Sequence, residues 1–353
     1  MSETLNLFEQ QARNRRQTAI LMVVFVLFFA WLGFGGDLVL YLQSRDYYGQ
    51  AHYTVPWLGI VVTAIGALVA WNSWVRGPKR VLWSVGGREI VTPETHEERQ
   101  FVNVVEEMAV AAGLPRPKTY VVDDPDPNAF ATGHGPHDAS IAVTSGLLTS
   151  LNREELQGVV GHEMAHVRNL DVRLMTMVAA MVGVIVILSD VMGRFFGRGG
   201  GRMIAGGGGG GSRMFSGGGR GGGRRGGGGG ALVLVILVLW LISLILAPLV
   251  ARLMAMAISR NREYLADASA AELTRNPGAL ASALEKIESS AGPTKAMKRG
   301  TAHLCIADPL GRKVNAKEGR MADLFGTHPP MTKRLTILKG MAFQQAKSAA
   351  AQA

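Results

Sequence analysis

Cysteine is almost absent from this chain, which has Cys305 as its single cysteine among 353 residues. No intramolecular disulfide can therefore form, and a structural zinc site built from cysteines is excluded. Charged residues make up only 18% of the chain, whereas 48% of the residues are hydrophobic. This mixture indicates long apolar runs separated by polar, folded segments.

Acidic residues are missing from the stretch between Gly193 and Gly230, which holds seven arginines and 22 of the chain's 45 glycines. Setting those seven charges aside reduces the net charge from +10 to +3, so the basic character belongs to one segment. The segment has almost nothing apolar to bury, and we expect it to be disordered. Arg-Gly segments can bind RNA. With Phe215 as the one aromatic residue away from its edge, base stacking would be weak, and we expect no specific nucleic-acid partner.

Four apolar runs have about the length that crosses a lipid bilayer. A cleaved signal peptide is the alternative reading of the first run, but the run is too long and no small-residue cleavage pattern clearly closes it. The chain is therefore predicted to be a multi-pass membrane protein. The four runs are Ala19–Tyr41, Val55–Val75, Leu174–Met192 and Ala231–Val250.

Charges around the first two runs predict their orientation. Basic residues lie outside both runs, and the connector between the runs has only Arg45. Because basic residues are enriched on the cytoplasmic side, the N-terminus and the chain after Arg76 are placed in the cytoplasm. A transporter is a rival class, but Asp37 and Asp190 are the only acids inside or beside the runs, which is too few for an ion path.

The chain between about Val81 and Asp171, and again after the fourth run, has the patterns of a folded domain. The stretch Asp123–Ala139 is rich in Asp, Pro, Gly and His, which predicts an irregular loop. Capping residues and periodicity predict the regular elements around it. The predicted helices are Thr95–Ala112, Arg153–His166 and Asn276–Ser290, and the predicted strands are Thr119–Val122 and Ser140–Thr144.

The pattern His-Glu-Met-Ala-His places His162 and His166 four residues apart in a predicted helix, with Glu163 between them. Residues at this spacing share one helix face, so both imidazoles can bind one zinc ion. Glu163 can reach a water on that metal and take its proton without binding the ion itself. The alternative is two surface histidines, but apolar Val159, Val160 and Met164 surround the pattern.

A catalytic zinc takes three protein ligands and keeps one position open. The extended metzincin pattern would require glycine and histidine where this chain has Asn169 and Val172. The best candidate for the third ligand is Glu263. Asp267 follows four residues later, on the same helical face, and is placed to orient a ligand histidine through its free ring nitrogen. From spacing alone, Glu263 could equally be an ordinary charged helix residue.

These motifs together resemble those of the HtpX-type membrane metalloproteases, relatives of the CAAX prenyl endopeptidases. The zinc pattern is followed by Arg-x-x-Glu-Tyr-x-Ala-Asp at 260–267, and segments 128–148 and 327–335 resemble further family motifs. The resemblance covers nearly the whole chain, although the Gly/Arg-rich insert departs from the usual pattern. It implies that one zinc ion per chain is held by His162, His166 and Glu263, with Glu163 as base. It also implies proteolytic quality control of misfolded or membrane proteins, and a stress-response role, at the bacterial inner membrane.

Four other residues are candidates for supporting roles. Asn128 could present a strand to the substrate backbone or form a turn beside a proline. His328 could stabilise the oxyanion of the reaction or be a loop histidine before a proline. Asp171 could orient a ligand histidine or mark the membrane boundary. Arg334, in the C-terminal motif, is a further candidate for contact with the metal-binding residues or with substrate.

The sequence therefore predicts a mainly α membrane protein with a zincin-like α+β catalytic domain, a small sheet and about four transmembrane helices. Its predicted partners are the lipid bilayer and unfolded or membrane protein substrates, whose internal peptide bonds are hydrolysed on the cytoplasmic side. The predicted divisions are an N-terminal cytoplasmic segment (1–18), two transmembrane helices (19–76), the first part of the zincin domain with the zinc-binding helix (77–173), a third apolar helix (174–193), the disordered loop (194–230), a fourth apolar helix (231–258), the second part of the zincin domain with the third ligand (259–341) and a flexible tail (342–353).

Overall fold

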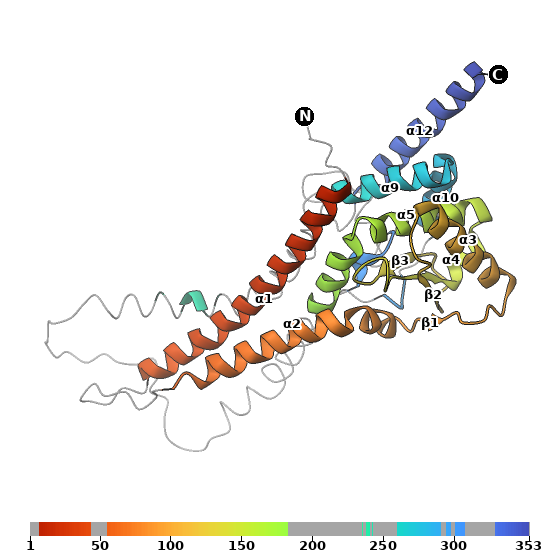
Figure 1. The fold of residues 1–353 in the computed structure, drawn as a ribbon. Coiled ribbons are helices and arrows are strands. Elements are labelled where there is room, and N and C mark those ends of the chain that lie inside the picture. The colour runs from red at the N-terminus through yellow and green to blue at the C-terminus, as the bar shows by residue number, and fades with distance from the viewer. Residues whose placement is uncertain are drawn as a thin grey trace, which may run out of the picture. The chain divides into compact units, whose positions relative to one another are not determined.

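The fold is described from a computed structural model (Figure 1), which covers residues 7–43, 55–182, 235, 238–240, 242, 260–290, 294–297, 301–307 and 329–352. The chain divides into two compact units. One unit comprises Met1–Val23, Ala70–Gly183 and Arg252–Ala353, and the other comprises Val24–Val69 and Val184–Ala251. The predicted disordered loop, most of the third and fourth apolar runs and His328 lie outside the described residues.

Two helices have the length and apolar character of membrane spans. Helix α1 (Leu7–Gln43) and helix α2 (Trp57–Ser84) contain the candidate spans Glu9–Tyr41 and Trp57–Ser84. These are the two candidate spans in the part of the chain that the structure describes, and they agree with the first two predicted runs. The third and fourth spans remain predictions.

Asp37 is an acid within the first span, and it is buried. Its carboxylate accepts the backbone N–H groups of Leu58 and Gly59 at the start of α2. It thereby satisfies donors that have no partner inside the helix. The two helices approach closely here, because a Cβ atom on Gly33 would lie only 2.8 Å from the Cα of Gly59. In this position the acid joins the two helices at the start of α2.

The first of these units contains a four-stranded sheet in the order β1-β2-β4-β3. Strands β2 and β4 are parallel, and the other two pairs are antiparallel. β2 and β4 confirm the two predicted strands, but β3 lies inside the stretch predicted as an irregular loop. That prediction is corrected: all four residues of β3 are buried, so tertiary pairing with β4 forms this strand despite its loop-like surroundings. The strands are β1 (Arg88–Glu89), β2 (Lys118–Val122), β3 (Ala129–Thr132) and β4 (Ser140–Thr144).

Helices pack around this sheet, and three of them begin where the sequence predicted. Thr95 and Asn152 cap α3 and α5 through side-chain acceptors, and Asn276 caps α10, whose first residue is Pro277. Residues 171–182 are helical after the turn that ends α5. The helices of this unit are α3 (His96–Ala112), α4 (Ser145–Ser150), α5 (Arg153–Arg168), α9 (Arg260–Thr274), α10 (Pro277–Ser289) and α12 (Met331–Gln352), with a 3-10 turn, η1, at Ala302–Leu304.

The C-terminal segment differs from its prediction as a flexible tail, because α12 continues through it to Gln352. Its sequence is rich in alanine, the residue with the highest helix propensity. Gln345 also donates to the backbone carbonyl of Arg275 at 2.7 Å, so part of the segment contacts the end of α9.

Small residues on α5 allow α9 and α10 to pack closely against it. A Cβ atom on Gly158 would lie 2.9 Å from the Cα of Leu280 in α10. A Cβ atom on Gly161 would lie 3.6 Å from the Cα of Ala270 in α9 and 3.3 Å from a methyl of Thr274. This close approach sets the first turn of α9 beside the histidines of α5.

Candidate metal centre

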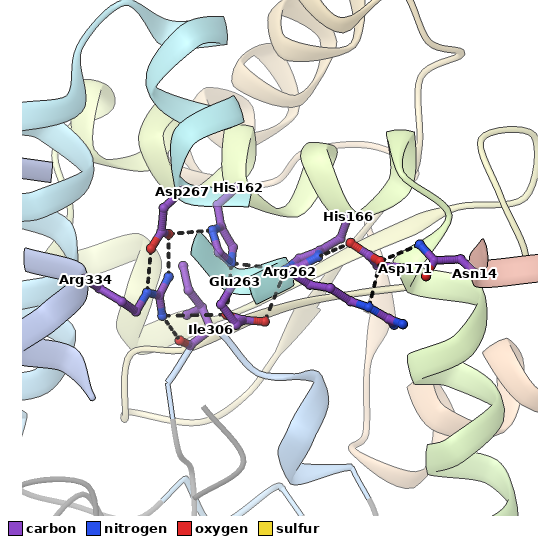
Figure 2. A network of polar contacts seen from close by, with 9 residues as sticks. All are labelled: Asn14, His162, His166, Asp171, Arg262, Glu263, Asp267, Ile306 and Arg334. Carbon is purple, nitrogen blue, oxygen red and sulfur yellow. Dashed lines mark hydrogen bonds and ion pairs between the residues drawn. The ribbon is translucent and has the colours of Figure 1, made fainter. Parts of the chain in front are cut away.

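The two histidines of α5 and the glutamate of α9 bring their ligand atoms together inside the protein (Figure 2). The Nε2 atoms of His162 and His166 are 3.2 Å apart. The carboxylate of Glu263 lies 3.7 Å from the first of these nitrogens and 3.5 Å from the second. All three side chains are buried.

This arrangement fits a single bound metal ion. Two nitrogens that bind one zinc at about 2.0–2.1 Å and a tetrahedral angle are about 3.3 Å from each other. The observed Nε2–Nε2 distance of 3.2 Å agrees with that geometry. The three ligand atoms lie within 4.8 Å of one another, and no other group of this kind occurs among the described residues. Three protein ligands also leave one coordination position for a water or a substrate oxygen.

Each histidine is oriented by a carboxylate on the side away from its Nε2 atom. Asp267 Oδ1 lies 2.9 Å from Nδ1 of His162, and Asp171 Oδ2 lies 3.3 Å from Nδ1 of His166. Such carboxylate partners fix the ring orientation and leave the other nitrogen for the metal. The chain brings Asp171 to this position by a turn in which Leu170 adopts a φ of 60°.

Arg334, from α12, holds the carboxylate that faces His162 (Figure 2). Its Nε and Nη2 atoms donate to the two oxygens of Asp267 at 2.8 and 2.7 Å. Its Nη1 donates to the carbonyl of Ile306 at 2.9 Å and lies 3.8 Å from Glu263. The guanidinium is completely buried, so this paired geometry must offset the cost of removing its charge from water.

The charges around the site favour a cation at its centre. Burial alone would lower the pKa of His166, but the hydrogen bond to Asp171 and the charge of Glu263 together raise it to about 9. Burial likewise acts against ionisation of Asp267, yet Arg334 lowers the pKa of that carboxyl to about 2. Carboxylates outnumber the nearby cationic groups, and a divalent ion between the ligands would balance them.

Glu163 follows His162 in α5 but is not one of the three residues whose ligand atoms come together. Its carboxyl is buried beside the ligand histidines and meets the backbone N–H of Ala131 in β3. Burial raises the pKa of Glu163 to about 7, and the charge of Glu263 acts in the same direction. A carboxyl with a pKa near neutrality can both accept and return a proton at physiological pH.

The structure places the remaining predicted residues in different settings. Asn128 is buried, and its amide donates to Thr294 Oγ1 at 3.1 Å and to the carbonyl of Ala307 at 3.2 Å. It therefore fastens the start of β3 to the segment around 294–307. His328 lies outside the described residues.

The structure also shows contacts that the sequence did not indicate. Arg262 places its Nε atom 3.5 Å from Asp171, and Asn14 donates to the same carboxylate. The adjacency of Arg262 to Glu263 was a usable signal for the first contact. No local signal pointed to Asn14, which is separated from Asp171 by 157 positions.

Comparisons with known proteins give consistent results. A family model described as "Peptidase family M48" matches residues 95–342. A "Protease HtpX homolog" of Lactobacillus helveticus is 37% identical over 335 residues, which cover 95% of this chain and 100% of that relative. Another from Thermoanaerobacter pseudethanolicus is 40% identical over 339 residues, covering 95% and 98%. Among solved structures, "Crystal Structure of S. mikatae Ste24p" matches with a TM-score of 0.43 and 20% identity, covering 91% of this chain and 66% of that chain.

Proposed function

The chain belongs to peptidase family M48 and is an HtpX-type membrane metalloprotease, and on this basis we propose that it is a zinc endopeptidase. The observation that carries the proposal is the convergence of His162, His166 and Glu263 within 4.8 Å, with the buried carboxyl of Glu163 beside them. The substrates proposed are misfolded or membrane proteins, cleaved at internal peptide bonds as part of quality control under stress.

We assign His162, His166 and Glu263 as the ligands of one zinc ion per chain. When bound, zinc would lower the pKa of a water molecule and polarise the substrate carbonyl. Asp267 and Asp171 hold the ligand rings in orientation, and both are buried. These assignments are supported by the Nε2–Nε2 distance of 3.2 Å and by the carboxylate at Nδ1 of each ring.

Glu163 would take the proton of the attacking water and then return it to the leaving amine. Burial raises the pKa of this carboxyl, which helps it to hold the proton between the two steps. The neighbouring Ala131 N–H gives its carboxyl a fixed partner on β3. A substrate backbone that added as a strand along this edge of β3 would have to pair with groups other than the Ala131 N–H, which Glu163 occupies.

Asn128 would support this strand indirectly by anchoring the start of β3. The edge before Ala131 is already paired: Ile306 N–H donates to the Ala129 carbonyl at 2.9 Å, and Phe130 bridges Cys305. A substrate strand would therefore meet β3 between this pairing and Gly133, whose N–H donates to Thr176 Oγ1 at 3.2 Å.

The proposed location is the bacterial cytoplasmic membrane, with four spans and the active site facing the cytoplasm. Two spans are supported by α1 and α2. The orientation is supported by the basic residues that flank them on the outer sides of the pair. The partners that follow are the lipid bilayer and protein substrates, with no specific nucleic acid.

The proposal is tested by Glu163→Gln in the full-length, detergent-purified protein with an unfolded protein substrate. The amide keeps the size of the side chain but cannot accept a proton, so turnover should fall by about 10²–10⁴-fold or more, while bound zinc stays at one equivalent. Glu272→Gln, at an exposed position of α9, is the control and should be fully active. Chelator-sensitive cleavage that persists in Glu163→Gln would contradict the assignment of the base.

A further inference from the structure

The N-terminal part of α1 packs against the end of the metal-binding helix. Residues up to Val23 belong to the same compact unit as α5. Gln11 Nε2 donates to the carbonyl of Arg168, the last residue of α5, at 2.8 Å. One turn further along α1, Asn14 Nδ2 donates to the carbonyl of Asn169 at 2.8 Å and to Asp171 Oδ1 at 2.7 Å. Asn14 is only 4% exposed, so these contacts are made away from water.

The two oxygens of Asp171 have different partners. Oδ2 faces Nδ1 of His166 at 3.3 Å, while Oδ1 accepts from Asn14 and lies 3.5 Å from Arg262 Nε. The rotation of this carboxylate is therefore set by the groups on Oδ1. Arg262 in turn donates to Gln17, also on α1. Helix α1 thus contacts both Asp171 and the guanidinium of Arg262 beside it. Figure 2 shows Asn14, Arg262 and His166 around Asp171.

An amide is well suited to this position. Asn14 donates a hydrogen bond without adding a charge, so it can fix the carboxylate while leaving it negative for His166. Its single NH₂ group reaches both the Asn169 carbonyl and Asp171, which ties the carboxylate to the backbone turn that follows α5. A side chain that only filled space would not need a donor here.

We propose that Asn14 is a positioning residue of the metal centre, acting through Asp171 on the orientation of His166. This inference rests on the proposed metal site. Asn14 lies in α1, within the candidate span Glu9–Tyr41, so this contact connects that helix to the metal centre through Asp171. The contacts run from Asn14 to Asp171 and from Asp171 to His166.

The test uses the full-length protein in detergent and measures zinc affinity by competition with a chromophoric chelator. Asn14→Ala should weaken zinc binding, by no more than the about 10–100-fold expected for losing Asp171, the direct partner of His166. Asn14→Asp keeps the size of the side chain but replaces the donor with a second carboxylate facing Asp171, and should weaken binding at least as much. In the cobalt-substituted proteins, both changes should alter the visible absorption spectrum, which reports ligand geometry.

Gln11→Ala is the matched control, since it removes one hydrogen bond between the same helix and the end of α5 without touching Asp171. It should leave zinc affinity and the cobalt spectrum unchanged, whatever it does to thermal stability. Equal effects of Gln11→Ala and Asn14→Asp, or no effect of Asn14→Asp, would overturn the positioning role. Should Asn14→Ala fail to fold, Asn14→Asp alone decides. Wild-type protein that binds no zinc would instead refute the proposed function itself.

Discussion

Replacing Arg334 with methionine should be among the most damaging single changes outside the ligands. The guanidinium makes two hydrogen bonds to Asp267, at 2.8 and 2.7 Å, and one to the Ile306 carbonyl, at 2.9 Å. Methionine preserves much of the volume but leaves the buried Asp267 carboxylate without its counterion. Breaking a buried pair from one side costs about 3–5 kcal/mol, which is a large part of the roughly 5–15 kcal/mol that stabilises a typical folded domain.

Arg334→Met should lower both the thermal stability and the zinc affinity, and the two effects can be measured separately. Arg334→Met should unfold at a much lower temperature, measured in detergent on metal-free protein so that metal binding does not mask the difference. The double variant Arg334→Met/Asp267→Asn leaves no unpaired charge and should recover much of the stability. It should not recover zinc affinity, because His162 still lacks its carboxylate, and the deficit should be about 10–100-fold.

Arg334→Lys is the control that keeps the positive charge but loses the planar guanidinium group. Lysine keeps one positive charge but cannot match both oxygens of Asp267 at once, so it should fall between the wild type and Arg334→Met. An unfolding temperature of metal-free Arg334→Met equal to that of the wild type would refute the reasoning, because no buried carboxylate could then depend on this guanidinium.

Two further experiments address the ligand set and the membrane topology. Glu263→Ala should lower zinc content and activity together, because two histidines leave an under-coordinated ion; metal analysis should show Glu272→Ala, at an exposed position of the same helix, to be nearly silent. Retention of a full equivalent of zinc with unchanged affinity in Glu263→Ala would refute it as a ligand. A cysteine placed near Gly208 in a Cys305→Ser background should be labelled from outside intact cells if the third and fourth runs both cross, and protection from the label would exclude the four-span arrangement.

Local signals explain which parts of the fold could be predicted from the sequence. Helix α5 carries its own start signal, since Asn152 and Glu155 form a reciprocal cap, and its histidine spacing defines one face before any tertiary contact exists. The chemistry predicted for that face agrees with the observed closeness of His162 and His166. Strand β3 has no such local signal, because its few apolar residues lie between Asp, Pro, Gly and His. The resemblance of segment 128–148 to a family motif pointed to a strand there, and pairing with β4 forms it.

The contacts that complete the metal centre are non-local, and this is why sequence reasoning left them open. From its helical spacing alone, Glu263 could be either a metal ligand or an ordinary charged helix residue. The packing of α9 on the small residues of α5 brings it to the histidines. Arg334 could be grouped with the site only through a resemblance, because its partner Asp267 is 67 positions away. Such pairings are decided by how helices pack and not by the properties of either segment alone.

The dependence of Asp267 on α12 also bears on the order in which the protein is made. A ribosome delivers α5 and α9 before α12, so a nascent chain can carry both histidines, Glu263 and Glu163 while Arg334 is still missing. In that interval Asp267 has no guanidinium, and burying it beside His162 is unfavourable. The centre should therefore close only after α12 has emerged from the ribosome and docked, which delays hydrolytic competence until that point.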